Sequence, residues 1–248
     1  MNLASSIRQS PAFLTAEWRW LAMLNYGIDP AVLEPFVPRG TELDAWNGKH
    51  LVSIVGFLFL NTRLKGIPIP GHQNFEEVNL RFYVRRKTPD GWRRGVSFIR
   101  EIVPRRAIAT IARVFYEEPY LALPMSHEIR FEGGLPRDVA YRWTHGKTPG
   151  EIRIETTGDW KPLQEGSGEE FITEHYWGYT KRFRGPASEY EVIHPRWRTM
   201  DVKSARFSAG VAALYGGEFS DALAAEPFSA FLAEGSHITV RLGSRMVS

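Results

Sequence analysis

The chain has 248 residues, 43% of them hydrophobic, with 31 basic and 28 acidic side chains and no cysteine. The absence of cysteine excludes a disulfide framework, a thiolate nucleophile, an iron–sulfur cluster and zinc held by cysteine, and it fits a reducing compartment. The longest apolar run, residues 51–60, is too short for the roughly 20 residues that span a bilayer, and residues 1–15 do not resemble a signal peptide. We therefore expect a cytoplasmic protein with no membrane partner.

The first expected strand covers residues 17–26, where apolar and aromatic side chains fall on alternate positions. One face of this strand would carry Trp18, Trp20, Ala22, Leu24 and Tyr26. Asp29 and Pro30 favour the start of a short helix, which Pro35 ends. Residues 51–60 are apolar on both faces, which is typical of a central buried strand.

A hairpin is expected next. Residues 75–86 alternate between apolar and polar side chains, and residues 88–91 have the sequence Thr-Pro-Asp-Gly, which favours a turn. Residues 94–103 would form the returning strand. Pro104 then favours a helix, whose apolar side chains follow helical spacing at Ile108, Ile111, Ala112 and Phe115.

The rest of the chain shows short strands separated by glycine and proline, with about ten residues between turns. A capping box at Ser167 and Glu170 predicts a short helix that runs to His175, and another helical piece is expected at residues 219–225. Further strands are expected at residues 125–131, 139–144, 152–156, 176–182, 189–194, 198–202 and 237–242. The pattern predicts one mostly β domain with short helices, residues 1–248, folded as a barrel or sandwich.

Several common catalytic motifs are missing from the sequence. Gly146-Lys147-Thr148 lacks the preceding glycine of a phosphate-binding loop, and there is no Gly-x-Ser-x-Gly, His-Glu-x-x-His or Gly-x-Gly-x-x-Gly. The seven histidines form no close pair, so a histidine-based metal site would need distant segments. We expect no metal and no cofactor.

The polar face of the strand at residues 75–86 is the first candidate site. It presents Glu77, Asn79, Arg81 and Tyr83 at two-residue spacing. The simple interpretation is the solvent-facing side of an antiparallel strand. The functional interpretation is a row inside a barrel, where Glu77 moves a proton and Asn79, Arg81 and Tyr83 hold a small carboxylate.

A second group consists of Arg100 and Glu101, followed by Arg105 and Arg106 after Pro104. Neighbouring cations repel each other, which is useful where an anionic ligand binds. The alternative is an exposed basic helix start, which the helix dipole disfavours. His175 and His194 form a third group within aromatic clusters; these clusters are usually core, but a histidine there titrates near neutral pH and could bind or exchange protons with a ligand.

The basic residues are unevenly distributed along the chain. The 24 arginines outnumber the 7 lysines, and residues 81–113 carry a net charge of +8. Genome composition can raise arginine content without any functional meaning. Because these arginines alternate with acids and apolar residues instead of following one helix face, we expect no nucleic-acid binding.

Several of these motifs together resemble the YqjF-like proteins, a family of unknown function in the acetoacetate decarboxylase-like superfamily. The resemblance covers most of residues 16–200, and its most specific part is the strand Phe-x-Glu-x-Asn-x-Arg-x-Tyr-Val. The matching residues are Tyr26, Asp29, Leu33, Val37-Pro38, Leu43-Asp44, Phe75 to Val84, Gly95-Val96, Ala112-Arg113 and Pro119-Tyr120.

The resemblance implies a conical, double-layered antiparallel β barrel around a closed central cavity. Acetoacetate decarboxylase forms a Schiff base through a lysine. Glu77 matches an acid of that enzyme, and the segment from Arg100 to Arg106 resembles its nucleophile segment with arginine in place of both lysines. Gly27 stands where its substrate-binding arginine is expected. Because guanidinium remains protonated, this comparison implies no decarboxylation by the amine route.

Two hypotheses follow for the function. The first is an enzyme-like protein that acts on a small anionic carbonyl or carboxylate compound in the cavity. The second is a non-catalytic module that binds or senses a partly apolar small molecule, with aromatic residues as its walls. In either case we expect a small-molecule ligand, and we expect a homodimer because exposed sheet edges commonly pair.

Overall fold

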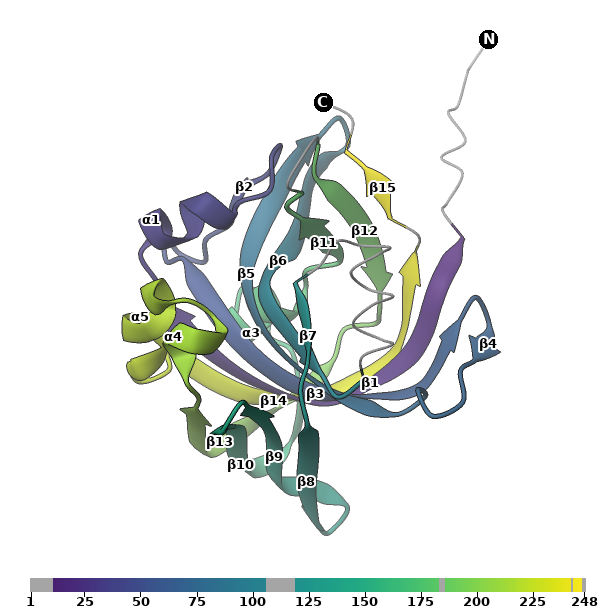
Figure 1. Cartoon of the computed structure of the whole chain (residues 1–248), viewed down its shortest axis with the longest axis vertical. Coiled ribbons are helices and arrows are strands. Elements are labelled where there is room, and N and C mark those ends of the chain that lie inside the picture. Colours follow the sequence, from purple (N-terminus) through teal and green to yellow (C-terminus); the bar gives the residue numbers. More distant parts are fainter. Residues whose placement is uncertain (1–10, 106–118, 183–185, 242, 247–248) are drawn as a thin grey trace.

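Seven strands of the chain close into a barrel (Figure 1). The computed structural model describes residues 11–105, 119–182, 186–241 and 243–246. In the barrel the order is β12-β11-β6-β5-β3-β1-β14, and β12 pairs with β14 through Val192 and Val240 to close the ring. The neighbours are antiparallel except β6 and β11, which are parallel. Their bounds are β1 (Ala12–Gly27), β3 (Leu51–Leu64), β5 (Phe75–Thr88), β6 (Gly91–Val103), β11 (Trp177–Thr180), β12 (Ser188–Ile193) and β14 (Ser229–Arg241).

A second layer of strands continues the sheet from β14 and covers part of the outside of the barrel. It runs in the order β13-β10-β9-β8 and lies at the lower end of Figure 1. The Tyr141 hydroxyl donates a hydrogen bond to the Trp20 carbonyl oxygen at 2.8 Å, which joins this layer to β1. Its bounds are β13 (Arg198–Ser208), β10 (Thr148–Pro162), β9 (Leu135–His145) and β8 (Met125–Glu132).

Short elements complete the described fold. The Asp29 side chain accepts a hydrogen bond from the Ala31 N–H, and the Ser167 hydroxyl accepts one from the Glu170 N–H, so both expected helix starts are capped. The helices are α1 (Pro30–Leu33), η1 (Glu34–Phe36), α3 (Gly168–Thr173), α4 (Val211–Leu214), η2 (Gly217–Phe219) and α5 (Ser220–Ala224). The short strands are β2 (Glu42–Leu43), β4 (Ile67–Pro68), β7 (Tyr120–Ala122) and β15 (Ser244–Arg245).

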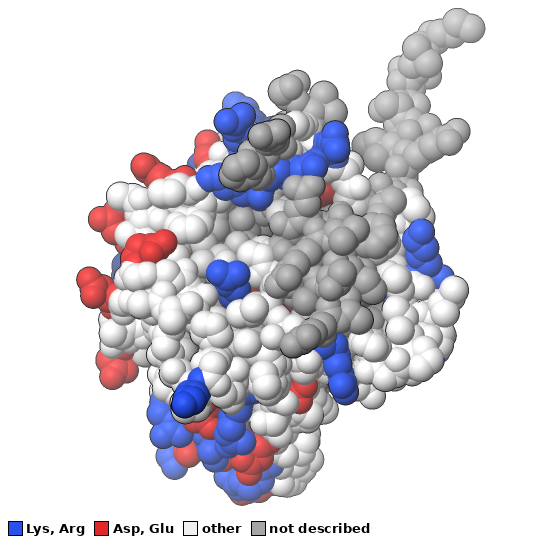
Figure 2. Space-filling model, in the orientation of Figure 1, with Lys and Arg blue, Asp and Glu red and all other residues white. Residues whose placement is uncertain are grey.

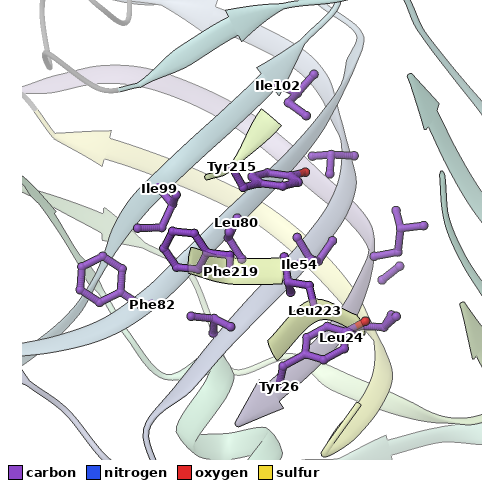
Figure 3. Packing of buried hydrophobic residues seen from close by; sticks show 14 of the residues in the cluster. Leu24, Tyr26, Ile54, Leu80, Phe82, Ile99, Ile102, Tyr215, Phe219 and Leu223 are labelled. Atoms are coloured by element: carbon purple, nitrogen blue, oxygen red, sulfur yellow. The ribbon is translucent and has the colours of Figure 1, made fainter. Parts of the chain in front are cut away.

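The alternating strands serve two separate cores. One core lies outside the barrel wall, between it, the second layer and the helices α4 and α5; Figure 3 shows Leu80, Phe82 and Ile99 meeting Tyr215 and Phe219 there. The other core lies on the inner face of the barrel strands and includes aromatic rings from β1, β3 and β5. Residues 51–59 of β3 are accordingly buried on both faces, as expected for residues 51–60.

The expected mostly β fold is confirmed, and each expected strand corresponds to a strand of the structure. Several strands extend beyond their expected ends; β14, for example, begins at Ser229 rather than near residue 237. The short strands β2, β4, β7 and β15 and the helix α4 were not expected. The helix expected after Pro104 falls largely on residues 106–118, outside the described residues.

The expectation that Trp18 and Trp20 share a face of the first strand is wrong. Trp20 has a positive φ of 54°, and the pairing of β1 with β3 shifts between Arg19 and Ala22. Such a bulge adds a residue to one strand and reverses which side chains face inward. Trp18 therefore packs in the inner core, and Trp20 packs against the outer one.

The basic stretch near residue 90 is largely paired with acids from other segments. Arg85 pairs with Glu42, Arg86 and Arg93 pair with Glu189, and Arg94 pairs with Asp44. On the face shown in Figure 2, basic and acidic side chains also mix over the lower end, where the second layer lies. These four arginines thus supply ion pairs within the fold.

Candidate functional site

The barrel holds a partly open cavity of about 180 Å³ with mostly aromatic and aliphatic walls. Inward-facing side chains from the barrel strands supply these walls, because alternate residues of each strand point inward. Trp18 contacts Phe57, Phe59 and Trp197 edge-on, with ring centroids 5.3 to 6.2 Å apart. The aromatic lining residues are Phe13, Trp18, Phe57, Phe59, Phe75, Phe98, Tyr120, Trp177, Tyr190 and Trp197.

A row of polar side chains on β5 breaks this apolar lining. Glu77, Asn79 and Arg81 all line the cavity, and both Glu77 and Asn79 are only 3% exposed. The Asn79 amide donates to Glu77 Oε1 at 3.1 Å, and the Tyr120 hydroxyl donates to Glu77 Oε2 at 3.2 Å. Both oxygens of the Glu77 carboxylate therefore accept hydrogen bonds, which holds the group in a fixed orientation.

The Arg81 side chain reaches from β5 to the helix α3. Its guanidinium donates to the Ile172 carbonyl oxygen at 3.0 Å and lies 5.7 Å from the centre of the Tyr83 ring. It is the one Lys or Arg side chain among the described residues that line the cavity. An anionic ligand in this cavity would therefore find its positive partner in Arg81.

Glu101 contributes a second acid from the neighbouring strand. It lies opposite Asn79 in the pairing of β5 with β6, is 2% exposed and lines the cavity. Side chains opposite each other on paired strands are close neighbours. Glu101 therefore extends the polar row of β5 onto β6.

His175 enters the cavity wall directly after α3 and is backed by buried Asp44. Its Nε2 atom lies 3.4 Å from Asp44 Oδ2, which also accepts a hydrogen bond from Arg94 Nε at 2.6 Å. Burial lowers the pKa of His175 to about 4, against the opposing effect of Asp44. Burial alone would raise the pKa of Asp44, but the contacts with His175 and Arg94 outweigh it and lower that pKa to about 2. At neutral pH the pair is a neutral imidazole beside a carboxylate.

His194 lies in the aromatic part of the cavity wall. Its ring stacks on Trp197, with centroids 4.1 Å apart, and also contacts Tyr176. Burial lowers its pKa to about 4, so this imidazole is also neutral at pH 7.

Three of the described candidate residues do not line the cavity. Arg100 points to the outer side of the barrel wall, where its Nε donates to the Leu214 carbonyl oxygen at 3.2 Å. Arg105 is exposed, and Arg106 lies outside the described residues. Tyr83 is buried behind the lining, where its hydroxyl lies 2.6 Å from Ser53 Oγ and its ring packs 4.8 Å from that of His175. The structure thus brings together Glu77, Asn79, Arg81, Glu101, His175 and His194.

Comparison with known families identifies the chain. The model of the family DUF2071, described as "Uncharacterized conserved protein", matches residues 15–237. The chain belongs to DUF2071. Among curated proteins, "Uncharacterized protein YqjF" of Bacillus subtilis (strain 168) is 32% identical over 112 residues. That match spans 45% of this chain and 45% of YqjF, less than half the length of either protein.

Solved structures similar to this DUF2071 protein have the acetoacetate decarboxylase-like fold. Acetoacetate decarboxylase from Legionella pneumophila is 14% identical with a TM-score of 0.65, and the match covers 100% of this chain and 92% of that one. An acetoacetate decarboxylase-like enzyme from Sphingomonas wittichii RW1 is 14% identical with a TM-score of 0.66, over 96% and 94% of the two chains. The enduracididine biosynthesis enzyme MppR, complexed with pyruvate, is 14% identical with a TM-score of 0.62, over 98% and 93%. At these identities the likeness establishes the fold.

Sequence reasoning missed several residues of the DUF2071 site. Asp44 and Tyr120 were noticed only as parts of the family motif, although one backs His175 and the other holds Glu77. Because Asp44 follows a two-residue strand and Tyr120 begins a three-residue strand, no periodicity marks either side chain as inward-facing. Trp18 was predicted to share a strand face with Trp20, which is wrong because of the bulge at Trp20.

The lysines and potential metal ligands can be placed directly. All seven lysines lie in the described residues, and each is exposed on the outside of the protein: Lys49, Lys65, Lys87, Lys147, Lys161, Lys181 and Lys203. Within the described ranges, no three His, Asp or Glu side chains are grouped so that they could hold a metal ion. In the same ranges, no helix has the length and apolar character needed to cross a membrane.

Proposed function

We propose that the barrel cavity binds a small carboxylate or carbonyl compound, which Arg81 and Asn79 hold while Glu77 exchanges a proton with it. The observation that carries this proposal is the row of three polar side chains on β5 in a cavity whose walls are mostly aromatic and aliphatic. Buried polar groups destabilise a fold unless they are hydrogen-bonded. Their retention in one row is best explained by a ligand with a complementary polar end.

The proposed roles follow from the contacts of each side chain. Arg81 is a permanent cation with several donors, suited to a carboxylate. Asn79 is oriented by its bond to Glu77, so its position relative to a ligand is fixed. Glu77 is a carboxylate held by Tyr120 and Asn79, which is the arrangement expected of a proton acceptor.

Replacing Arg81 with leucine is expected to weaken the binding of a small carboxylate such as pyruvate by about 10- to 100-fold, the usual effect of losing a charge-assisted hydrogen bond. Arg85→Leu is the matched control, because Arg85 is on the same strand but pairs with Glu42 outside the cavity. Tryptophan fluorescence reports binding, since Trp18, Trp177 and Trp197 line the cavity. Equal affinities of the two variants would contradict the proposal.

We further propose that this protein does not use a Schiff base. An imine requires a neutral amine, and the lysines are exposed away from the cavity. Incubation with acetoacetate and borohydride, followed by intact mass measurement, is expected to leave the mass of the protein unchanged. A covalent adduct on any lysine would overturn this expectation.

A non-catalytic binding or sensing role is the second candidate, and the aromatic walls favour it. Such walls can retain a partly apolar molecule without changing it. Native mass spectrometry of the purified protein would identify a retained ligand. If that ligand is recovered unchanged after prolonged incubation with the wild type and with Glu77→Gln alike, the binding role replaces the catalytic one.

A further inference from the structure

Several buried polar atoms of the described cavity lining have no hydrogen-bond partner. Asn79 Oδ1, Arg81 Nε and His175 Nδ1 lie in its polar part, and, Glu101 aside, the others are Trp18 Nε1, Thr62 Oγ1 and His175 Nε2. Asn79 is 3% exposed, and the His175 side chain is 1% exposed. Asn79, Arg81 and His175 come from β5 and from the segment after α3, and all three line one cavity. A buried polar group without a partner is rare in native proteins, and several around one cavity point to a missing ligand.

The donor or acceptor character of these atoms restricts the ligand. The Asn79 amide nitrogen donates to Glu77, so Oδ1 is its free acceptor. The nearness of Asp44 to His175 Nε2 favours the proton on that nitrogen and leaves Nδ1 as an acceptor. Arg81 Nε is a donor. The polar end of the ligand must therefore offer both an acceptor and a donor.

A plain carboxylate or a 2-oxo acid has acceptors only, so neither complements Asn79 and His175. A hydroxyl group beside the carboxylate supplies one donor. An amino group would bring three donors and a positive charge, whereas both oxygens of Glu77 already accept hydrogen bonds from Asn79 and Tyr120. The unpaired atoms thus fit a hydroxy acid better than an oxo acid or an amino acid.

The size and walls of the cavity define the rest of the ligand. Its volume is about 180 Å³, slightly larger than an engineered apolar cavity of roughly 150 Å³ that binds benzene. The rings of Trp18, Phe57, Phe59 and Trp197 line it and already meet one another edge-on or tilted. One further aromatic ring would extend this packing, since aromatic pairs favour such arrangements.

We propose that the ligand is a single-ring aromatic 2-hydroxy carboxylate. Its ring lies among Trp18, Phe57 and Trp197, its carboxylate accepts from Arg81, and its hydroxyl donates to Asn79 Oδ1. This inference rests on the proposed function and names the substrate class of the same cavity.

The test compares ligands that share one skeleton. Affinities for the wild-type protein are measured by isothermal titration calorimetry with 3-phenyllactate, 3-phenylpropionate, phenylpyruvate, phenylalanine and lactate. We expect 3-phenyllactate to bind at least tenfold more tightly than each of the other four. Asn79→Leu is expected to reduce its advantage over 3-phenylpropionate to less than threefold, with circular dichroism as the check on folding.

The outcomes separate this inference from the function on which it rests. If 3-phenylpropionate or phenylpyruvate binds as tightly as 3-phenyllactate, the ligand does not need a hydroxyl donor. The inference is then overturned, but the proposed binding of a carboxylate is supported. If phenylalanine binds most tightly, an amino group takes the place of the hydroxyl and overturns the inference. If lactate binds as tightly as 3-phenyllactate, the aromatic ring adds no affinity, and the inference of an aromatic ligand is overturned. If none of the five binds, the proposed function fails together with the inference.

Discussion

Lowering the pH from 7.5 to 5 is expected to reduce the free energy of unfolding by about 4 kcal/mol, through His175 and His194. Burial lowers the pKa of each histidine to about 4, from 6.5 in the unfolded chain. Linkage between these pKa values gives about 2 kcal/mol per histidine at pH 5. A loss of this size is a large part of the 5 to 15 kcal/mol typical of native proteins.

The sign follows from which state binds the proton. At pH 7.5 and above, both histidines are almost entirely neutral in the folded and the unfolded states, so they add little pH dependence there. Between pH 6.5 and 4 the unfolded chain gains protons that the folded protein does not, and stability falls as the pH falls. The charged neighbours of His175 are Asp44, Arg94 and Arg81, and Asp44 stays ionised throughout this range because its pKa is lowered to about 2.

Urea unfolding at pH 7.5 and pH 5 measures the effect, and His175→Gln tests its source. The variant is expected to lose about half of the pH dependence, whatever its stability at pH 7.5, because one of two titrating groups is gone. Using the change between the two pH values removes the packing cost of the substitution. A wild-type protein equally stable at both values, or a variant with the full dependence, would refute the assignment.

The strands could be predicted from sequence because alternate residues of each barrel strand face two different environments, the outer core and the inside of the barrel. Val78, Leu80, Phe82 and Val84 pack in the outer core, and Glu77, Asn79 and Arg81 line the cavity. The pattern alone did not distinguish a cavity from solvent as the surroundings of the polar face. That distinction depends on the closure of β12 onto β14, a contact between distant parts of the chain.

The parts of the site that sequence reasoning missed depend on backbone irregularity or on tertiary contacts. The side of the wall that Arg100 faces is set by a shift in the pairing of β5 and β6, between Leu80 and Arg81. That shift places Glu101 in the cavity and its neighbour Arg100 against Leu214. Asp44 was missed for a different reason, because its partners His175 and Arg94 come from other segments.

Replacing Gly235 with alanine is expected to destabilise the protein by more than about 4 kcal/mol, the range of exceptional single substitutions. Gly235 has φ of +77°, and an added Cβ would lie 2.0 Å from the Trp18 carbonyl oxygen. That contact is with the backbone of the paired strand β1, so no side-chain rotation can relieve it. Any relief requires β1 and β14 to separate near Trp18, whose ring lines the cavity.

Gly133→Ala is the matched control, because it separates backbone strain from the collision. Gly133 also has a positive φ, of +59°, but an added Cβ would meet nothing within 4 Å. Its replacement is expected to cost only about 1 kcal/mol. Urea unfolding of both variants at pH 7.5 compares their free energies of unfolding. If Gly235→Ala is insoluble while Gly133→Ala is soluble, this also shows that the collision at Gly235 is the more destabilising change. Equal losses would show that β1 and β14 can move apart at little cost, and the bulge that turns Trp18 into the cavity would then be adaptable rather than fixed by Gly235.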